Sequence, residues 1–65
     1  MRQWLKDIRV KKGLTTYEVA ATAGISQSLY SSIENGSRGV TVAKAKKIAA
    51  ALGFEWAKFY EEMEE

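Results

Sequence analysis

Glycine residues divide this 65-residue chain into short helical segments. Four of its five glycines, Gly13, Gly24, Gly36 and Gly53, follow stretches with helical hydrophobic spacing, and the chain contains no proline. A glycine suits the C-terminal end of a helix because it enters the left-handed backbone conformation without a steric cost. The chain is therefore predicted to be all-α, with five short helices.

Hydroxyl side chains mark where several of these helices begin, because they can accept a hydrogen bond from a backbone N–H of the first turn. Thr15 is followed by Glu18 three residues later, which is the pattern of a capping box. Ser26 and Thr41 occupy the same place before the next two segments. The predicted helices cover about 2–12, 16–23, 27–35, 42–52 and 55–62, and an acidic tail follows the last of them.

Apolar residues spaced three or four apart give each helix a face that can be buried. Trp4 on the first helix and Tyr30 on the third are expected in the core, and Ala20 and Ala23 are small enough to let helices approach closely. The fourth helix carries an apolar stripe on one side and three lysines on the other. The stripe is Val42, Ala45, Ile48, Ala49 and Leu52, and the lysines are Lys44, Lys46 and Lys47.

Residues 16–35 form two helices joined by a tight turn at 24–26, which is the pattern of a helix-turn-helix. Gly24 can end the first helix and Ser26 can cap the second. The second helix begins with Gln27 and Ser28 and carries no charge in its first turn. Short uncharged donor–acceptor side chains suit the base edges of a DNA major groove. Double-stranded DNA is therefore the predicted partner.

The charge of the chain is unevenly distributed. Residues 1–53 contain nine Lys and Arg against three Asp and Glu, a balance of +6, whereas residues 54–65 contain one Lys against five Glu, a balance of −4. A basic body suits a polyanion, and an acidic tail is repelled by one. Both regions could equally be ordinary solvated surfaces, so charge alone does not decide between the two interpretations.

Several classes of function find no support in the sequence. The chain contains no cysteine and no histidine, so disulfides and the usual zinc sites are excluded. We expect no metal, no cofactor and no small-molecule ligand. Paired carboxylates of a catalytic pocket and a glycine-rich phosphate loop are also missing, so we expect no enzyme activity. No apolar run approaches the roughly 20 residues that span a membrane, and a cytoplasmic protein is expected.

Two segments resemble a known family. The pattern GLTTYEVAATAGISQSLYSSIENGSR, followed by KKIAAALGF, is similar to the lambda-repressor-like helix-turn-helix family, also called Cro/cI or XRE. The resemblance extends from Trp4 to Tyr60, and the ending GFEWAKFYEE resembles small repressors of phage and mobile elements. It implies one compact five-helix DNA-binding domain over residues 1–65, with the helix-turn-helix at 16–35 and a C-terminal helix at 55–62.

The resemblance also implies which residues face DNA. Gln can bond adenine in a bidentate manner, whereas Ser is an adaptable partner that carries less sequence information. Hydroxyls, Arg and helix N-termini are suitable phosphate ligands. The implied base contacts are Gln27, Ser28, Ser31 and Ser32, and the implied phosphate contacts are Thr16, Tyr17, Asn35, Ser37, Arg38 and Thr41.

Two positions depart from the family pattern. Thr16 stands where a Gln is common, and it is expected to be too short to support Gln27 as a Gln does. Gly39 and Val40 replace a frequent proline before the fourth helix, so a looser loop is expected there. Gln27 could instead be solvated, Arg38 could belong to a mobile loop, and the three lysines are expected mainly to form a solvated surface.

An ion pair is implied between Arg9 on the first helix and Glu34 at the end of the third. These positions often carry a partly buried pair in the family. Such a pair would fix the third helix against the first, although the cost of desolvation limits its net contribution to stability.

The sequence thus predicts a sequence-specific transcriptional regulator, in particular a repressor that binds a palindromic operator as a homodimer. Trp56, Phe59 and Tyr60 on the last helix are predicted to form the dimer interface. The alternative for these aromatic residues is that they close the core of a single molecule. The alternative function is an antitoxin or adaptor-type protein-interaction module built on the same fold.

Overall fold

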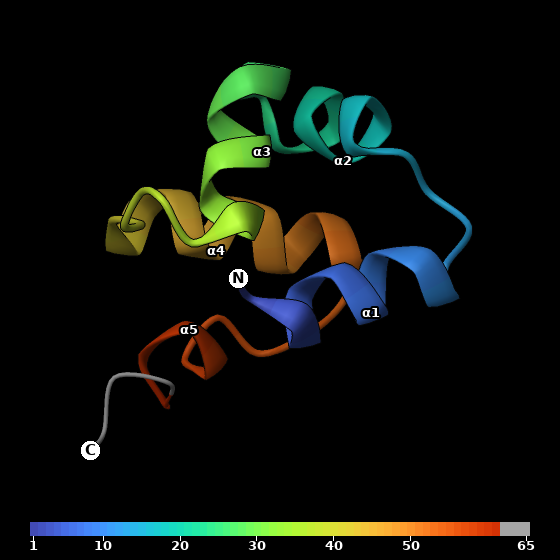
Figure 1. Ribbon diagram of the computed structural model, residues 1–65. Helices are drawn as coiled ribbons and strands as arrows, with labels where there is room; N and C mark the ends of the chain where they lie inside the picture. The colour runs from blue at the N-terminus through green and yellow to red at the C-terminus, as the bar shows by residue number, and fades with distance from the viewer. Residues whose placement is uncertain (62–65) are drawn as a thin grey trace.

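The computed structural model describes residues 1–61, and this part of the chain is all-helical (Figure 1). In Figure 1, α2 and α3 lie above α4, and α1 and α5 lie below it. The all-α prediction with five helices is confirmed. The predicted end of the last helix at residue 62 and the acidic tail after it lie outside the described residues. The helices are α1 (Gln3–Lys11), α2 (Thr16–Ala23), α3 (Gln27–Asn35), α4 (Val42–Leu52) and α5 (Lys58–Glu61).

The helix boundaries follow from the predicted caps. Thr15 Oγ1 accepts the backbone N–H of Glu18 at 3.1 Å, and the Glu18 carboxylate accepts the backbone N–H of Thr15 at 2.8 Å, which completes the capping box. Ser26 Oγ accepts from Leu29 N at 3.0 Å. Thr41 Oγ1 likewise accepts from Lys44 N at 3.2 Å. These bonds satisfy backbone donors that have no partner inside a helix, and so they fix where each helix begins.

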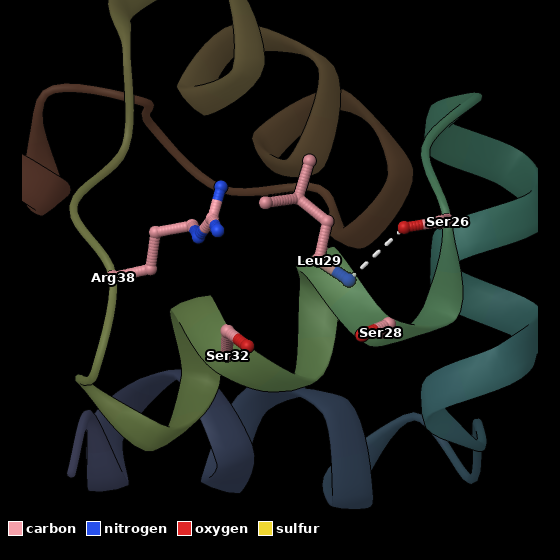
Figure 2. A pocket seen from close by; sticks show the side chains of 5 residues that line it. All are labelled: Ser26, Ser28, Leu29, Ser32 and Arg38. Atoms are coloured by element: carbon pink, nitrogen blue, oxygen red, sulfur yellow. Dashed lines mark hydrogen bonds between the residues drawn. The ribbon is translucent and has the colours of Figure 1, made fainter.

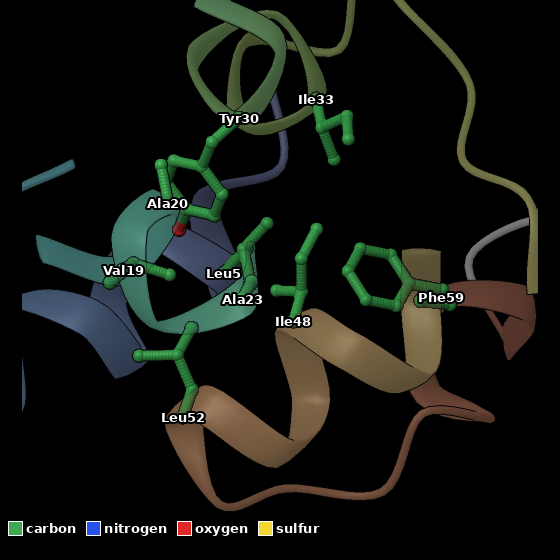
Figure 3. Close-up of a cluster of buried hydrophobic side chains, with 10 residues drawn as sticks. Leu5, Val19, Ala20, Ala23, Tyr30, Ile33, Ile48, Leu52 and Phe59 are labelled. Carbon is green, nitrogen blue, oxygen red and sulfur yellow. The ribbon is translucent and has the colours of Figure 1, made fainter. Parts of the chain in front are cut away.

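The core lies where the five helices meet. α2 packs against both α3 and α4, and its buried Ala20 and Ala23 leave room for the neighbouring helices. Figure 3 shows the side chains that fill this space, including Tyr30 of α3, Ile48 of α4 and Phe59 of α5. Every helix contributes to one cluster, which holds the two helices of the helix-turn-helix in place. Its buried members are Leu5, Val19, Ala20, Ala23, Tyr30, Ile33, Ala45, Ile48, Leu52 and Phe59.

Two features of the helices differ from the prediction. α5 begins at Lys58 rather than near residue 55, because residues 55–57 form a turn in which Glu55 O and Trp56 O accept from Lys58 N and Phe59 N. Val42, predicted in the apolar stripe of α4, is 46% exposed. It is the first residue of that helix, and the core cluster against which the rest of the stripe packs does not include it.

An aromatic cluster joins α5 to α1. The ring of Phe59 lies 5.1 Å from that of Trp4 in an edge-to-face arrangement, and Phe54 lies 5.5 Å from Trp4. Phe59 is only 1% exposed, so it has no surface left for a second molecule, and its predicted place in a dimer interface is wrong. Trp56 and Tyr60 are half-buried and contact each other edge to face at 5.7 Å.

None of the helices within residues 1–61 has the length and apolar character that a membrane span requires.

Candidate nucleic-acid interface

The two helices of the helix-turn-helix are joined through a left-handed glycine. Gly24 has a φ of 75°, and the backbone N–H groups of Gly24 and Ile25 return to the carbonyls of Ala21 and Ala20 at 3.2 and 3.0 Å. These bonds satisfy carbonyls at the end of α2, and an L side chain at position 24 would be strained. The turn therefore sets the angle at which α3 leaves α2.

The residues predicted to contact bases share one side of α3. They lie at positions 27, 28, 31 and 32, and residues three and four apart in a helix are neighbours on its surface. Gln27 and Ser28 are exposed, whereas Ser31 and Ser32 are half-buried. Figure 2 shows Ser28 and Ser32 one turn apart on α3. The accessible end of this polar row is thus the N-terminus of α3.

Thr16 does support Gln27, contrary to the prediction from its length. Gln27 Nε2 donates to Thr16 Oγ1 at 2.9 Å. Each residue is the first of its helix, and the turn brings these two N-terminal ends close enough for a short hydroxyl side chain to suffice. An amide has two N–H groups and a carbonyl oxygen, so one N–H and the oxygen remain after this bond. Those are the two groups that a bidentate contact with adenine requires.

An open hollow of about 300 Å³ lies between α3 and the loop at residues 36–41, which we call the 36–41 loop. Figure 2 shows Arg38 reaching from this loop toward Leu29 across the hollow. Hydroxyls and a guanidinium are donors that suit a phosphate group. Sequence reasoning did not single out Leu29, whose half-buried apolar side chain gave no functional signal. The lining residues are Ser26, Ser28, Leu29, Ser32 and Arg38.

The predicted phosphate-contacting residues lie on two sides of α3. Thr16 and Tyr17 begin α2, and the Tyr17 side chain is 66% exposed. The other four lie at the end of α3 and in the 36–41 loop, up to the cap of α4. Two of their hydroxyls already have partners in the protein, since Ser37 Oγ donates to Ser32 O at 3.3 Å and Thr41 Oγ1 caps α4. Asn35, Ser37, Arg38 and Thr41 are all exposed.

Arg2 holds the 36–41 loop, which was expected to be looser because it lacks a proline. Its guanidinium Nη1 donates to Ile33 O and to Arg38 O, the latter at 3.2 Å. Its backbone N–H donates to Glu34 O at 2.9 Å. Sequence reasoning counted Arg2 only as part of the basic body, because its partners are more than 30 residues away along the chain.

A buried hydrogen-bonded network fixes the other side of α3. Arg9 and Glu34 form the expected ion pair, with Nε to Oε2 at 2.8 Å and Nη2 to Oε1 at 3.2 Å. Tyr30 OH donates to the same Oε2 at 2.9 Å, and Arg9 Nη1 donates to Leu14 O at 2.8 Å. The side chains of Arg9 and Glu34 are only 13% and 6% exposed.

The pKa shifts in this network agree with its geometry. The hydrogen bond to Glu34 raises the pKa of Arg9, and burial, reinforced by the Glu34 carboxylate, raises the pKa of Tyr30. Arg9 therefore stays protonated, and Tyr30 stays a neutral hydroxyl that donates to Glu34. The network connects α1 to α3 at Glu34, the second-to-last residue of α3.

The lysines of α4 differ in their surroundings. The Lys46 ammonium lies 5.2 Å from the centre of the Trp56 ring, a cation–π distance, whereas Lys44 is half-buried and Lys47 is exposed.

Residues 1–61 contain no group of three or more acidic, cysteine or histidine residues placed to hold a metal ion. The candidate interface therefore consists of amide, hydroxyl and guanidinium groups on one side of the helix-turn-helix.

Comparisons with known proteins assign the family. The helix-turn-helix family profile matches residues 5–59. The uncharacterized HTH-type transcriptional regulator YqaF of Bacillus subtilis (strain 168) is 48% identical over 63 residues, which is 97% of this chain and 83% of YqaF. The control protein C.MunI of Mycoplasma sp is 36% identical over 61 residues, which is 92% of this chain and 82% of C.MunI.

A solved structure gives the same assignment. The crystal structure of a mutant of the restriction-modification controller protein C.Esp1396I superposes with a TM-score of 0.75 at 29% sequence identity, over 91% of this chain and 77% of that one. This chain is therefore similar to a relative in three-dimensional fold as well as in sequence. The chain therefore belongs to the XRE-type helix-turn-helix family of DNA-binding transcriptional regulators.

Proposed function

We propose that this regulator is a cytoplasmic repressor that binds a palindromic operator as a homodimer and has no catalytic activity. The observation that carries the proposal is the Gln27 amide, held by Thr16 at the exposed N-terminus of α3 with groups left for a base. Because the amide is held before DNA arrives, less conformational entropy is lost on binding. Ser28 beside it adds an adaptable hydroxyl.

The phosphate contacts proposed on either side would position α3 in the groove. Tyr17 and Thr16 begin α2, and Arg38 lies in the loop beyond the other end of α3. Contacts of this kind fix orientation without reading the sequence. In helix-turn-helix proteins the second helix enters the major groove while the first crosses the backbone, and this geometry supports the proposed contacts of the two groups with the DNA backbone.

Pairing of two molecules would provide the selectivity that one short helix lacks. With Phe59 buried in the core, the proposed interface reduces to Trp56 and Tyr60, whose rings are half-buried. A two-fold pair would place its half-sites one helical turn apart, about 34 Å or ~10 base pairs from centre to centre. The operator would then read the same on both strands.

Selection of bound sequences from a random pool of duplex DNA tests this proposal. We expect one enriched sequence with two-fold symmetry and half-sites about ten base pairs apart. Its binding should weaken steeply as salt rises because phosphate contacts displace condensed cations. Sedimentation with the selected duplex should give two protein molecules per duplex. An unenriched pool would contradict the proposal, and a protein partner captured by the purified chain without DNA would favour the interaction-module alternative.

Replacing Gln27 with alanine is expected to lower discrimination at one base pair of each half-site by about 1–3 kcal/mol. Thr16→Val, which removes the hydroxyl that holds the amide, should cause a smaller loss of discrimination. Thr16→Ser, which keeps a hydroxyl, should retain the original preference. Competition binding against single-base operator variants measures both effects. Gln3→Ala serves as the control, because Gln3 is an exposed glutamine on α1 that bonds Asp7. Unchanged preferences in the Gln27 variant would show that this residue does not read a base.

A further inference from the structure

We propose that Arg2 is a positioning residue, which caps the C-terminus of α3 and holds the Arg38 loop in the geometry that binds phosphate. The proposal rests on the proposed function, because it assumes that Arg38 contacts the DNA backbone. Arg2 itself acts through Arg38 and not on the DNA.

The geometry begins with one nitrogen atom that bridges two backbone carbonyls. Arg2 Nη1 donates both to Ile33 O, in the last turn of α3, and to Arg38 O, in the 36–41 loop. This single donor group therefore links the last turn of α3 to the backbone of Arg38. The backbone N–H of Arg2 adds a third bond, to Glu34 O at 2.9 Å. Three carbonyls are thus held by one residue.

The end of α3 needs such a partner. The last carbonyls of a helix have no N–H donor within the helix, and this end carries the negative pole of the helix dipole. α3 has no basic residue in its own last turn. Arg2 supplies donors from outside the helix, its backbone N–H to Glu34 O and its guanidinium to Ile33 O, which also accepts from Gly36 N, and the guanidinium adds the positive charge that the last turn lacks. Its planar fork of donors suits two carbonyls in fixed positions better than a flexible ammonium does.

Ser37 ties the start of the 36–41 loop to α3, because its backbone N–H and its hydroxyl donate to Ser32 O at 3.1 and 3.3 Å, and the bond from Arg2 restrains the loop one residue further on. Gly36 and Gly39 flank Ser37 and Arg38, and Gly36 has a φ of 86°, so two glycines, the residue type with the freest backbone, lie on either side of the segment that contains the proposed phosphate ligand. The bond to Arg38 O attaches the backbone of that ligand directly. Because Arg2 orders the loop when the protein folds, this ordering costs no conformational entropy when DNA binds. Arg2 should therefore strengthen binding without touching DNA.

A further contact keeps Arg2 in place from the side of the core. Its guanidinium carbon lies 5.8 Å from the centre of the Phe59 ring, within the range of a cation–π interaction. Phe59 is buried against Trp4. The guanidinium is therefore held between the aromatic cluster and the end of α3, and this restricts the positions that it can take.

A double-mutant cycle on the full chain tests the proposal. The variants are Arg2→Met, Arg38→Met and the pair, and binding of the selected duplex is measured over a range of salt concentrations. We expect Arg38→Met to weaken binding about tenfold for each half-site, the effect of losing one charged phosphate contact, and to lower the salt slope by about one for each half-site. Arg2→Met should produce part of the same loss and slope change. In the Arg38→Met background it should produce no further loss, and operator preference should be unchanged throughout.

Lys12→Met is the matched control for charge. The Lys12 ammonium lies beside Gly53, at the opposite end of α4 from the 36–41 loop. The substitution removes the same unit of positive charge as Arg2→Met. Any loss that it causes measures the long-range electrostatic effect and is subtracted from that of Arg2→Met. Backbone ¹⁵N relaxation of the free protein gives a separate readout, in which Arg38 and Gly39 should become more mobile in Arg2→Met but not in Lys12→Met. Arg2→Lys provides a folded variant, with charge but without the fork, if Arg2→Met unfolds.

The outcomes separate this proposal from the proposed function. Failure of the original protein to bind any duplex in a salt-dependent way would remove the proposed function itself. If it binds and Arg38→Met weakens binding, but the losses from Arg2 and Arg38 multiply in the pair, then Arg2 acts independently and the positioning role is wrong. Unchanged mobility at Arg38 and Gly39 in the Arg2 variants would also overturn it.

Discussion

Replacing Glu34 with alanine is expected to lower the free energy of unfolding by about 3–5 kcal/mol, the cost of removing one partner from a buried ion pair. Glu34 accepts two bonds from Arg9 and one from Tyr30, and its side chain is 6% exposed. Without it, the largely buried guanidinium of Arg9 keeps only its bond to Leu14 O, and the buried phenol of Tyr30 loses its acceptor. At about 0.05–0.15 kcal/mol per residue, a domain of 65 residues has a total stability of roughly 3–10 kcal/mol, so this loss approaches unfolding. Urea denaturation followed by circular dichroism measures it.

The matched control replaces the whole network with apolar side chains of similar size. The variant Arg9→Met, Tyr30→Phe, Glu34→Met leaves no buried charge without a partner, and it should lose less stability than Glu34→Ala alone. Part of its remaining loss should come from Leu14 O, which accepts from Arg9 Nη1 in the original protein. If the triple variant is the less stable of the two, then the network contributes net stability and the argument from desolvation is wrong.

The parts of the fold that sequence reasoning predicted depend on contacts between residues close in the chain. The caps at Thr15, Ser26 and Thr41 each bond a backbone N–H three residues ahead. The glycine that ends α2 has the left-handed φ that its position required. Such signals need only the residue types and their spacing, so helix order and the turn between α2 and α3 could be deduced without coordinates.

The parts that sequence reasoning missed depend on contacts between distant residues. The bonds from Arg2 to Ile33 and Arg38 span 31 and 36 residues, and no local pattern indicates them. The bond between Gln27 and Thr16 spans 11 residues, and its formation depends on how closely the two helix ends approach, which residue type alone does not fix. Tyr30 was expected in the core, but its role as a third member of the ion-pair network follows only from the geometry around Glu34.

The candidate site shows the same division. Periodicity was sufficient to place positions 27, 28, 31 and 32 on one side of a helix, because surface neighbours in a helix are set by the helical repeat. It could not give their exposure, which leaves Ser31 and Ser32 half-buried while Gln27 and Ser28 are exposed. The same limit applies to the aromatic residues of the C-terminal segment, where spacing alone did not separate the buried Phe59 from the half-buried Trp56 and Tyr60.

Replacing Phe59 with alanine is expected to lower the free energy of unfolding by about 3–5 kcal/mol, the usual range for a buried phenylalanine. Its ring is 1% exposed and contacts Trp4 at 5.1 Å and Phe54 at 5.7 Å, so its removal opens a cavity between α1 and α5 and takes away the surface on which Arg2 lies. The loss should be the same at low and high protein concentration, because the contacts lie within one molecule. Denaturation at two concentrations measures it.

Trp56→Ala is the matched comparison, since Trp56 is an aromatic residue of the same segment that remains half-buried and contacts Tyr60 and Lys46. The smaller area that it buries should make its effect on the single molecule weaker than that of Phe59→Ala. If Trp56 lies in the proposed dimer interface, its removal should reduce the dependence of stability on protein concentration, because pairing stabilises the folded state by mass action. Sedimentation then separates the two roles. A Phe59 variant that remains fully folded but no longer dimerises would show that Phe59 lies in the dimer interface, and would contradict its assignment to the core.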